Sequence, residues 1–413
     1  MPALILAAAA LAAQAATSAN PPTSTEPAKG PKLGQSTYLD IEGGVGYSSN
    51  PSLTIPSRGG AFGRISLHAV HARVSARSTT VLSGYVSNST YTSHHRSQQS
   101  LSVDARHDVA VSERLRLFGD AEVSFDKGGQ LDTRFLGVPN VPPPPGGPGT
   151  PPVLLPPGSD FLSVTGRTYH LGAHGGGQLA LSANDSLTFS SGVDHTVFRG
   201  GGQRSEFTTI PASLGYARQI SPRANVGVRL AYQHTDYDGP NSVQEITPEL
   251  TGRLLLSEQL VLSGAVGVSF ASTDNGVTTR HSTGLSAQAD LCQTGERTQF
   301  CGRFAVDQQT ATTAGPAKSL SAGIDYSRRL DADSTIQFSL AASHYSSPIF
   351  LFAGPTFSKA TYYRAAADYS RRISDRWFGG VDVAARKVTQ SGPDPKADVS
   401  GSLFVRYRFG DLQ

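Results

Sequence analysis

The 413-residue chain has little of several things on which other protein classes depend. Two Cys residues exclude a disulfide-dense scaffold and a Cys-rich zinc module. Charged residues make up 16% of the chain, against a typical ~25%. The 35 basic and 32 acidic residues leave a net charge of only +3, too balanced for the concentrated positive surface of a nucleic-acid binder. We therefore expect no nucleic-acid partner.

Long hydrophobic runs are also missing from the interior of the chain. The mean hydropathy is −0.23, and the absence of an internal apolar run of about 18 residues excludes helical membrane spans. The 44 Gly and 26 Pro residues disfavour long helices and coiled coils. One class of membrane protein does have such a composition. In a transmembrane β-barrel the lipid-facing residues occupy alternate positions, so no window of sequence is strongly hydrophobic.

The N-terminus has features of an export signal. Residues from Leu4 to Ala16 are almost wholly apolar, and Ala13-Gln14-Ala15 matches a cleavage site. We predict that residues 1–15 are a cleaved signal peptide and that residues 16–35, rich in Ser, Thr and Pro, are a flexible periplasmic leader. No Lys or Arg precedes the apolar run, so an Ala-rich helix of a cytosolic protein is the alternative.

From residue 36 onward, apolar and polar residues alternate with the period of a β-strand. The last segment is the clearest case. One of its faces carries Val399, Gly401, Leu403, Val405, Tyr407 and Phe409. The other carries Ser400, Ser402, Phe404, Arg406 and Arg408. A soluble β-sandwich has the same alternation, so the pattern predicts strands without choosing between the two architectures.

Short polar segments recur between the predicted strands and indicate tight turns. They are Ala76–Ser78, Ser112–Arg114, Ser182–Asp185, Ser221–Arg223, Ser257–Gln259, Asp331–Asp333 and Ser374–Arg376. Their spacing indicates a repeating unit of roughly 37 residues, with two long strands, one long loop and one short turn in each unit. With a further turn expected near residue 294, the repeat predicts nine hairpins. The predicted fold is therefore an all-β, antiparallel transmembrane β-barrel of about 18 strands over residues 36–413, with 16 strands as the alternative.

Parity along the predicted strands divides the inward-facing charges into two sets. Early strands carry mainly acidic residues: Asp40, Glu42, Asp104, Asp108, Asp120 and Glu122, with Arg106 and Arg116 among them. Late strands carry mainly basic residues: Arg364, Arg372, Arg386, Arg406 and Arg408, with Asp368 and Asp382 among them. Two interpretations remain open. The charges either form ladders that only hold the closure of the barrel, or form acidic and basic walls that select polar or charged solutes.

A long loop is expected at residues 127–165. It contains ten prolines between Pro139 and Pro157 and has no charged residue from Phe135 to Ser159, a composition that favours polyproline II structure over a sheet. It is the third long loop of the predicted barrel, and in some porins the third outer loop folds inward and constricts the channel. It is either a constriction of this kind or a surface insertion.

Cys292 and Cys301 flank the turn expected near residue 294. Export to an oxidising compartment favours a disulfide between them. His170 and His174 lie four residues apart on a predicted strand, roughly 13 Å, which is too far to share a metal ion directly. No Ser, His and carboxylate set stands out. We therefore expect no catalytic residues, no metal and no cofactor, although strands bring distant residues together and an outer-membrane enzyme remains an alternative.

The run Gly46-Tyr47-Ser48-Ser49-Asn50-Pro51 resembles the end of the first strand in a family of outer-membrane β-barrel porins linked to exopolysaccharide production. The last strand, with Tyr407 and Phe409, is similar to the terminal strand that the barrel-assembly machinery recognises, although four residues follow Phe409 here. These resemblances imply an outer-membrane location in a Gram-negative bacterium. The implied partners are outer-membrane lipid, the assembly machinery and a polysaccharide.

The expected function is that of a channel for polysaccharide or other polar solutes. Inward-facing aromatic residues suit contact with a sugar polymer: Phe118, Tyr362, Phe378 and Phe404. The alternative outside transport is a structural or adhesive barrel with a blocked lumen.

Overall fold

The computed structural model of the chain describes residues 34–51, 53, 58–92, 97–127, 167–199, 206–311, 315–346, 359–390 and 394–410. The predicted signal peptide, nearly all of the predicted leader and nearly all of the Pro-rich loop lie outside these residues. The described residues form 18 strands of 13 to 16 residues. Within them, no helix is long and apolar enough to cross a membrane.

Among the described residues, the strands follow one another with no helix between them. Their bounds are β1 Gly34–Ser48, β2 Gly60–Val74, β3 Ser78–Tyr91, β4 Gln98–Ala110, β5 Leu115–Lys127, β6 Arg167–Ala180, β7 Asp185–Arg199, β8 Phe207–Ser221, β9 Ala224–Tyr237, β10 Ser242–Leu255, β11 Leu260–Asp274, β12 Thr279–Thr294, β13 Thr298–Ala311, β14 Gly315–Arg329, β15 Ser334–Ser346, β16 Lys359–Arg372, β17 Trp377–Gln390 and β18 Asp398–Gly410.

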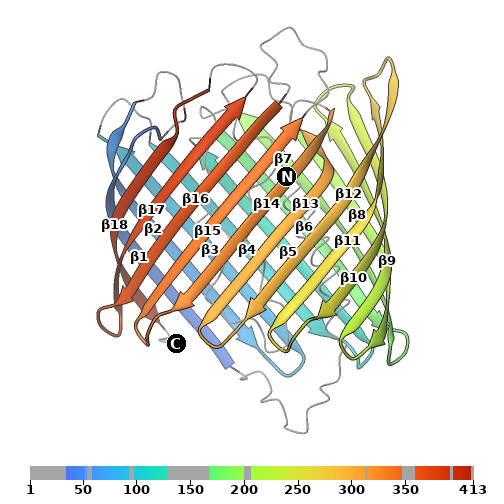
Figure 1. Ribbon diagram of the computed structural model, residues 1–413, viewed down its shortest axis with the longest axis horizontal. Helices are drawn as coiled ribbons and strands as arrows, with labels where there is room; N and C mark the ends of the chain where they lie inside the picture. Colours follow the sequence, from blue (N-terminus) through green and yellow to red (C-terminus); the bar gives the residue numbers. More distant parts are fainter. Residues whose placement is uncertain are drawn as a thin grey trace.

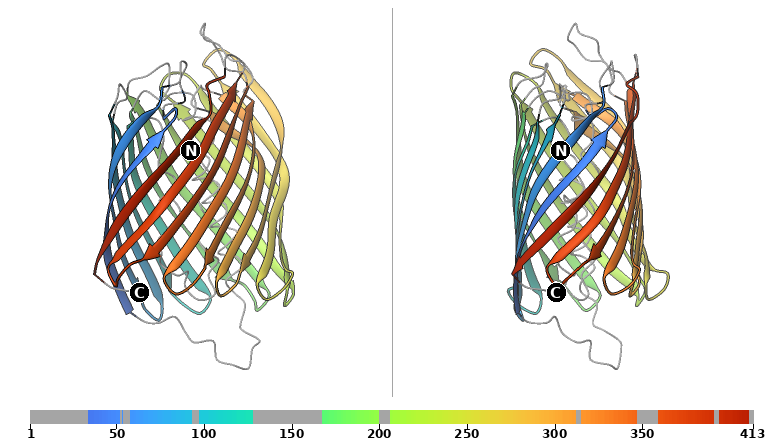
Figure 2. Two further views of the ribbon diagram at one scale, coloured as in Figure 1. Left: turned by 60° about the vertical axis from the view of Figure 1, so that its left-hand side comes forward. Right: turned by 90° about the vertical axis from the view of Figure 1, so that its left-hand side faces the viewer.

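Every strand pairs antiparallel with its neighbours in the sequence, and β1 also pairs with β18. The pairing of β1 with β18 extends from Tyr38 opposite Gly410 to Ser48 opposite Ser400. The sheet is therefore a closed, tilted barrel, in which the first strands, drawn in blue, lie beside the last strands, drawn in red (Figures 1 and 2). The barrel is narrower in the right-hand view of Figure 2 than in the left-hand view. The prediction of an antiparallel barrel with 18 strands is confirmed.

Alternation along each strand separates an apolar outer surface from a polar inner surface. On β18, Leu403 and Val405 are 63% and 49% exposed, whereas Ser402 and Phe404, which alternate with them, are each 4% exposed. Large apolar side chains are exposed on every stretch of the wall, from Val45 on β1 to Phe409 on β18. A sheet that exposes apolar side chains on the outside of a closed cylinder has the surface that lipid requires, and closure leaves no unpaired edge.

Short turns join the strands at one end of the barrel, and most of them are built on a serine. The Ser112 hydroxyl oxygen accepts a hydrogen bond from the Leu115 amide (3.0 Å). Ser182 and Ser257 do the same for the amides of Asp185 and Leu260, both at 3.1 Å. A short side chain that bonds to its own backbone replaces the ladder where the chain reverses. This explains why serine recurs at the sequence period of the hairpins.

Glycines on the inner surface make room for aromatic rings. A Cβ atom at Gly176 would collide with the ring of Phe118 and with the backbone oxygen of Phe189. A Cβ atom at Gly380 would collide with the ring of Phe404 in the same way. Both rings therefore lie over the wall, where they cover backbone that glycine leaves bare.

Candidate functional site on the inner wall

The inner wall carries nearly all of the charges selected from the sequence, and they form two groups. One group lies where the barrel closes, on β16–β18, β1 and β2. The other lies on β4–β7. These groups are described in turn, because their ion-pair partners differ.

The first group contains a paired set of charges that we call the seam network. Its members come from β1, β2, β17 and β18 and include as many acidic as basic residues. They are Asp40, Glu42, Arg64, Asp382, Arg406 and Arg408.

Closure of the ring creates the cross-strand pairs of this network. Asp40 lies directly opposite Arg408, and Glu42 lies directly opposite Arg406. Arg408 donates two hydrogen bonds of 2.7 Å to the two carboxylate oxygens of Asp40. Its guanidinium carbon also lies 4.4 Å from the centre of the Tyr38 ring. A planar, bidentate pair that stacks on an aromatic ring is the strongest form of this interaction.

Glu42 binds two arginines at once. Arg406 donates to one of its oxygens at 3.1 and 3.2 Å, and Arg64 donates to the other at 2.8 Å. Arg64 continues to Asp382 at 3.4 Å, and the Ser402 hydroxyl also donates to Asp382. Asp40, Glu42 and Arg64 are all less than 5% exposed. Buried charges of this kind require partners, and here each one has them.

A second set, the loop clasp, closes the seam at the long-loop end and consists of Ser48, Ser49, Asn50, Arg386 and Asp398. Asp398 is fully buried and accepts hydrogen bonds from the Ser48 hydroxyl (2.6 Å) and the Asn50 amide (2.8 Å). Arg386 forms an ion pair with the same carboxylate. The Ser49 hydroxyl accepts a hydrogen bond from the Val399 amide (2.8 Å). Three residues of the Gly46–Pro51 run thus bind the start of β18.

The second group is the acidic cluster, defined here as Asp104, Asp120, Glu122 and Asp194. Asp104 on β4 lies directly opposite Glu122 on β5. Glu122 lies opposite Gly172 on β6, and Gly172 lies opposite Asp194 on β7. One row across four strands therefore contains Asp104, Glu122, Gly172 and Asp194. Gly172 leaves a gap in the row because it has no side chain.

Two histidines accompany the cluster. His174 lies between two carboxylates, with Nδ1 at 3.0 Å from Asp120 and Nε2 at 3.0 Å from Asp194. His170 lies two residues beyond Gly172 on the other side, and its Nε2 is 3.7 Å from the second oxygen of Asp194. Within the described part of the chain, neither His170 Nε2 nor Asp194 Oδ1 has a hydrogen-bond partner. Asp194 is 1% exposed and His170 is 8% exposed.

The carboxylates of the row differ from those of the seam in their partners. Asp104 accepts hydrogen bonds only from hydroxyls, Ser102 at 2.9 Å and Ser83 at 3.4 Å. Among the described residues, neither Asp104 nor Glu122 forms an ion pair with Lys or Arg. Arg106 lies opposite Asp120 instead. Excess negative charge therefore accumulates on β4–β7.

The remaining predicted residues lie apart from both groups. Asp108 pairs with Arg116 at 2.5 Å near the short-turn end of β4 and β5. Arg372 pairs with Asp333 at 2.6 Å at the rim, where both side chains are partly exposed. Arg364 lies directly opposite Arg386 on the inner wall. Closure makes β1 and β18 neighbours, so Asp40 and Glu42 lie beside Arg408 and Arg406, the arrangement expected of ladders that hold the closure.

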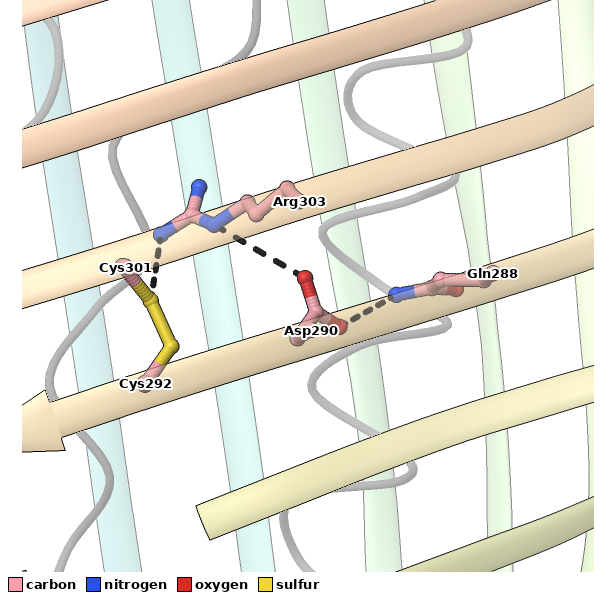
Figure 3. Close-up of a disulfide and its surroundings, with 5 residues drawn as sticks. All are labelled: Gln288, Asp290, Cys292, Cys301 and Arg303. Atoms are coloured by element: carbon pink, nitrogen blue, oxygen red, sulfur yellow. Dashed lines mark hydrogen bonds and ion pairs between the residues drawn. A yellow bond between two sulfur atoms is a disulfide. The ribbon is translucent and has the colours of Figure 1, made fainter. Parts of the chain in front are cut away.

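A disulfide joins Cys292 and Cys301, which lie directly opposite each other on β12 and β13 (Figure 3). Arg303 lies beside it, with Nη2 at 3.8 Å from the Cys301 sulfur and Nε at 3.7 Å from Asp290. The disulfide thus fixes one hairpin next to a short-turn end, as its position in the sequence predicts.

Sequence reasoning missed three residues of these groups: Arg64, Asp194 and Asp398. Parity would have placed Arg64 and Asp194 on the inner face, because each lies an even number of residues from an inward neighbour. Nothing in the sequence indicates that Arg64 reaches diagonally to Glu42, since its direct partner on β1 is Gly44. The described residues contain no set of three His, Cys, Asp or Glu side chains placed to hold a metal ion.

No protein-family model and no curated protein sequence matches the chain. Solved structures do resemble it. The FrpB iron transporter of Neisseria meningitidis aligns with a TM-score of 0.46 and 9% identity over 87% of this chain, which spans 64% of FrpB. OccK2 (OpdF) of Pseudomonas aeruginosa aligns with a TM-score of 0.45 and 10% identity over 93% of this chain and 100% of that one. The siderophore receptor PirA of Acinetobacter baumannii aligns with a TM-score of 0.43 and 8% identity over 92% and 81% of the two chains. Similarity at this level carries no information about a solute or ligand of this chain.

Proposed function

We propose that the protein is an outer-membrane channel for polar solutes, with no catalytic role. The observation that carries the proposal is the closed ring of 18 strands, apolar outside and lined inside with charges and hydroxyls. Barrels of 16 to 18 strands enclose an aqueous channel, whereas barrels of about eight strands are filled by their own side chains. The short-turn end would face the periplasm, and the long loops would face outward.

The balance of charge on the wall supports a preference for cations. The seam network contains three carboxylates and three guanidinium groups, so it adds no net charge to the lumen. In the row on β4–β7, Asp104 and Glu122 form no ion pair with Lys or Arg among the described residues, and Asp194 is paired with histidine. A ring or row of acidic side chains on a pore wall attracts cations and repels anions.

Single-channel recording tests the proposal. The full mature chain, folded into planar bilayers, should give stepwise conductance, and its reversal potential in a KCl gradient should show cation preference. A heat-modifiable shift on a gel would confirm folding independently. A protein that shows this shift and fractionates with the outer membrane but never conducts would contradict the channel and support a structural or adhesive barrel.

Export of an extracellular polysaccharide is the narrower form of this proposal. It is supported by the resemblance of the Gly46–Pro51 run and by the inward aromatic rings of Phe118, Tyr362, Phe378 and Phe404. Deletion of the gene should then abolish surface polymer while leaving the porin content of the outer membrane intact. Normal polymer in the deletion strain would refute this narrower form and leave the general channel standing. The predicted constriction by residues 127–165 falls almost wholly outside the described residues.

A further inference from the structure

The row of carboxylates on β4–β7 has the layout of a binding subsite. Two like charges that lie directly opposite each other on neighbouring strands destabilise a sheet. Asp104 and Glu122 have this arrangement, and the described donors to Asp104 are both hydroxyl groups. The wall therefore contains an unfavourable charge pair that a bound cation would relieve.

A second observation at the same place points to a missing ligand. Asp194 Oδ1 and His170 Nε2 belong to side chains that are more than nine-tenths buried. Neither atom has a hydrogen-bond partner among the residues that the structure describes. The two atoms are 3.7 Å apart, beyond hydrogen-bond distance of each other. An unsatisfied buried polar atom costs roughly 1–3 kcal/mol, so such atoms usually have a partner in the functional state.

The length of the row indicates the kind of cation. Neighbouring strands lie roughly 4.8 Å apart, so the row from β4 to β7 extends over roughly 14 Å. A metal ion binds ligands within about 2.0–2.6 Å and cannot contact both ends of such a row. A flexible chain with several ammonium groups can. Each ammonium carries three donors, which suit carboxylate oxygens and an imidazole nitrogen.

We propose that Asp104, Glu122 and Asp194, together with His170, form a subsite for linear polyamines on the inner wall. An ammonium group at one end of the ligand lies between Asp104 and Glu122. A second ammonium group lies over Gly172 and donates to Asp194 Oδ1. This inference rests on the proposed channel function, because the ligand reaches the wall through the lumen.

Spermidine is the probe. The test variant combines Asp104→Asn with Glu122→Gln, and Glu245→Gln is the control. Glu245 faces inward on β10 and accepts hydrogen bonds from Ser269 (2.5 Å) and Thr247 (3.2 Å), outside the row. We expect the double variant to weaken spermidine binding about ten-fold or more in calorimetry on the folded full chain, because charge-assisted hydrogen bonds are lost. The control should bind within about two-fold of the wild type, and succinate should bind to none of them.

The outcomes separate the subsite from the channel. A barrel that conducts but binds no spermidine, or binds it equally well in the double variant, overturns the subsite and leaves the channel intact. A folded barrel that binds spermidine through the row but never conducts supports the subsite and refutes the channel. If the double variant does not fold, the single variants Asp104→Asn and Glu122→Gln replace it. Each is then expected to weaken binding about three-fold, and an affinity equal to that of the wild type in both variants would contradict the proposal.

Discussion

The seam and the acidic cluster use the same residue types for opposite purposes. At the seam, every carboxylate of the network has a guanidinium partner, and Glu42 has two. In the row on β4–β7, Asp104 and Glu122 lie opposite each other and Asp194 lies opposite a glycine. Their described partners are hydroxyls and histidines in place of arginines. Under the proposed channel function, charge closes the barrel in one region and is available to a solute in the other. Four substitutions test this contrast.

The largest effect should follow from Asp398→Ala in the loop clasp. The substitution leaves the buried Arg386 without its carboxylate and removes the acceptor for Ser48 and Asn50. Breaking a buried ion pair in this way costs about 3–5 kcal/mol. Urea unfolding in lipid vesicles, followed by the fluorescence of the single tryptophan, Trp377, would measure it.

The matched control for that experiment is Asp375→Ala, in an exposed short turn. Its free energy of unfolding should change by about 0.5 kcal/mol or less. Equal effects of the two substitutions would show that the clasp does not hold the seam.

A reciprocal swap at Asp40 and Arg408 should give the next largest effect. Arg408→Glu alone places two carboxylates opposite each other and lowers the free energy of unfolding. Adding Asp40→Arg restores the pair, and a double-mutant cycle should give a coupling of about 1–3 kcal/mol. The doubly swapped barrel has unchanged net charge, so its ion selectivity should equal that of the wild type. A swapped, stable barrel with altered selectivity would assign the seam a role in solute choice.

Removal of charge from the acidic cluster should act in the opposite direction. Asp104→Asn with Glu122→Gln relieves a like-charge pair, so the free energy of unfolding should stay constant or rise by up to about 1 kcal/mol. The same vesicle assay measures this. A loss of about 2 kcal/mol or more would instead place these carboxylates in a satisfied interior network.

The smallest effect is expected at the rim, where Asp331 closes a short turn. The Asp333 amide (2.8 Å) and the Ser334 hydroxyl (3.1 Å) donate to Asp331 and hold the pKa of its carboxyl below the usual value. A carboxyl with a lowered pKa stabilises the fold at neutral pH and loses that contribution as the pH falls through its folded-state pKa.

Asp331→Asn should therefore lower the urea midpoint slightly at pH 7 and not at pH 2. The turn is fully exposed to solvent, so the difference is small. A difference that persisted at pH 2 would show that the carboxylate charge is not the cause.

Several features could be predicted from the sequence because they depend on local order. Period-two alternation identifies the strands, serine-containing turns separate them, and their spacing yields the count of 18. The Cys292 to Cys301 hairpin is predictable for the same reason, since its two strands are consecutive. The seam was predictable in part, because closure of any barrel pairs its first strand with its last.

The partners of individual charges were less predictable. Parity assigns a side chain to the inner face but leaves the stagger between neighbouring strands open. The diagonal contact from Arg64 to Glu42 depends on that stagger. So does the position of Asp194 between His170 and His174, above a glycine on the adjacent strand.

By itself, the sequence determined which residues form strands, which face of each strand lies on the outside of the barrel, and how many strands there are. A side chain on a strand points to one of two faces, and this choice follows from its position alone. Only the tertiary structure decided which charges neutralise one another. That choice depends on ring closure and on register, which bring together residues such as Asp40 and Arg408 from opposite ends of the chain. For this reason, the arginine-paired seam and the row without described arginine partners became distinct only in the folded barrel.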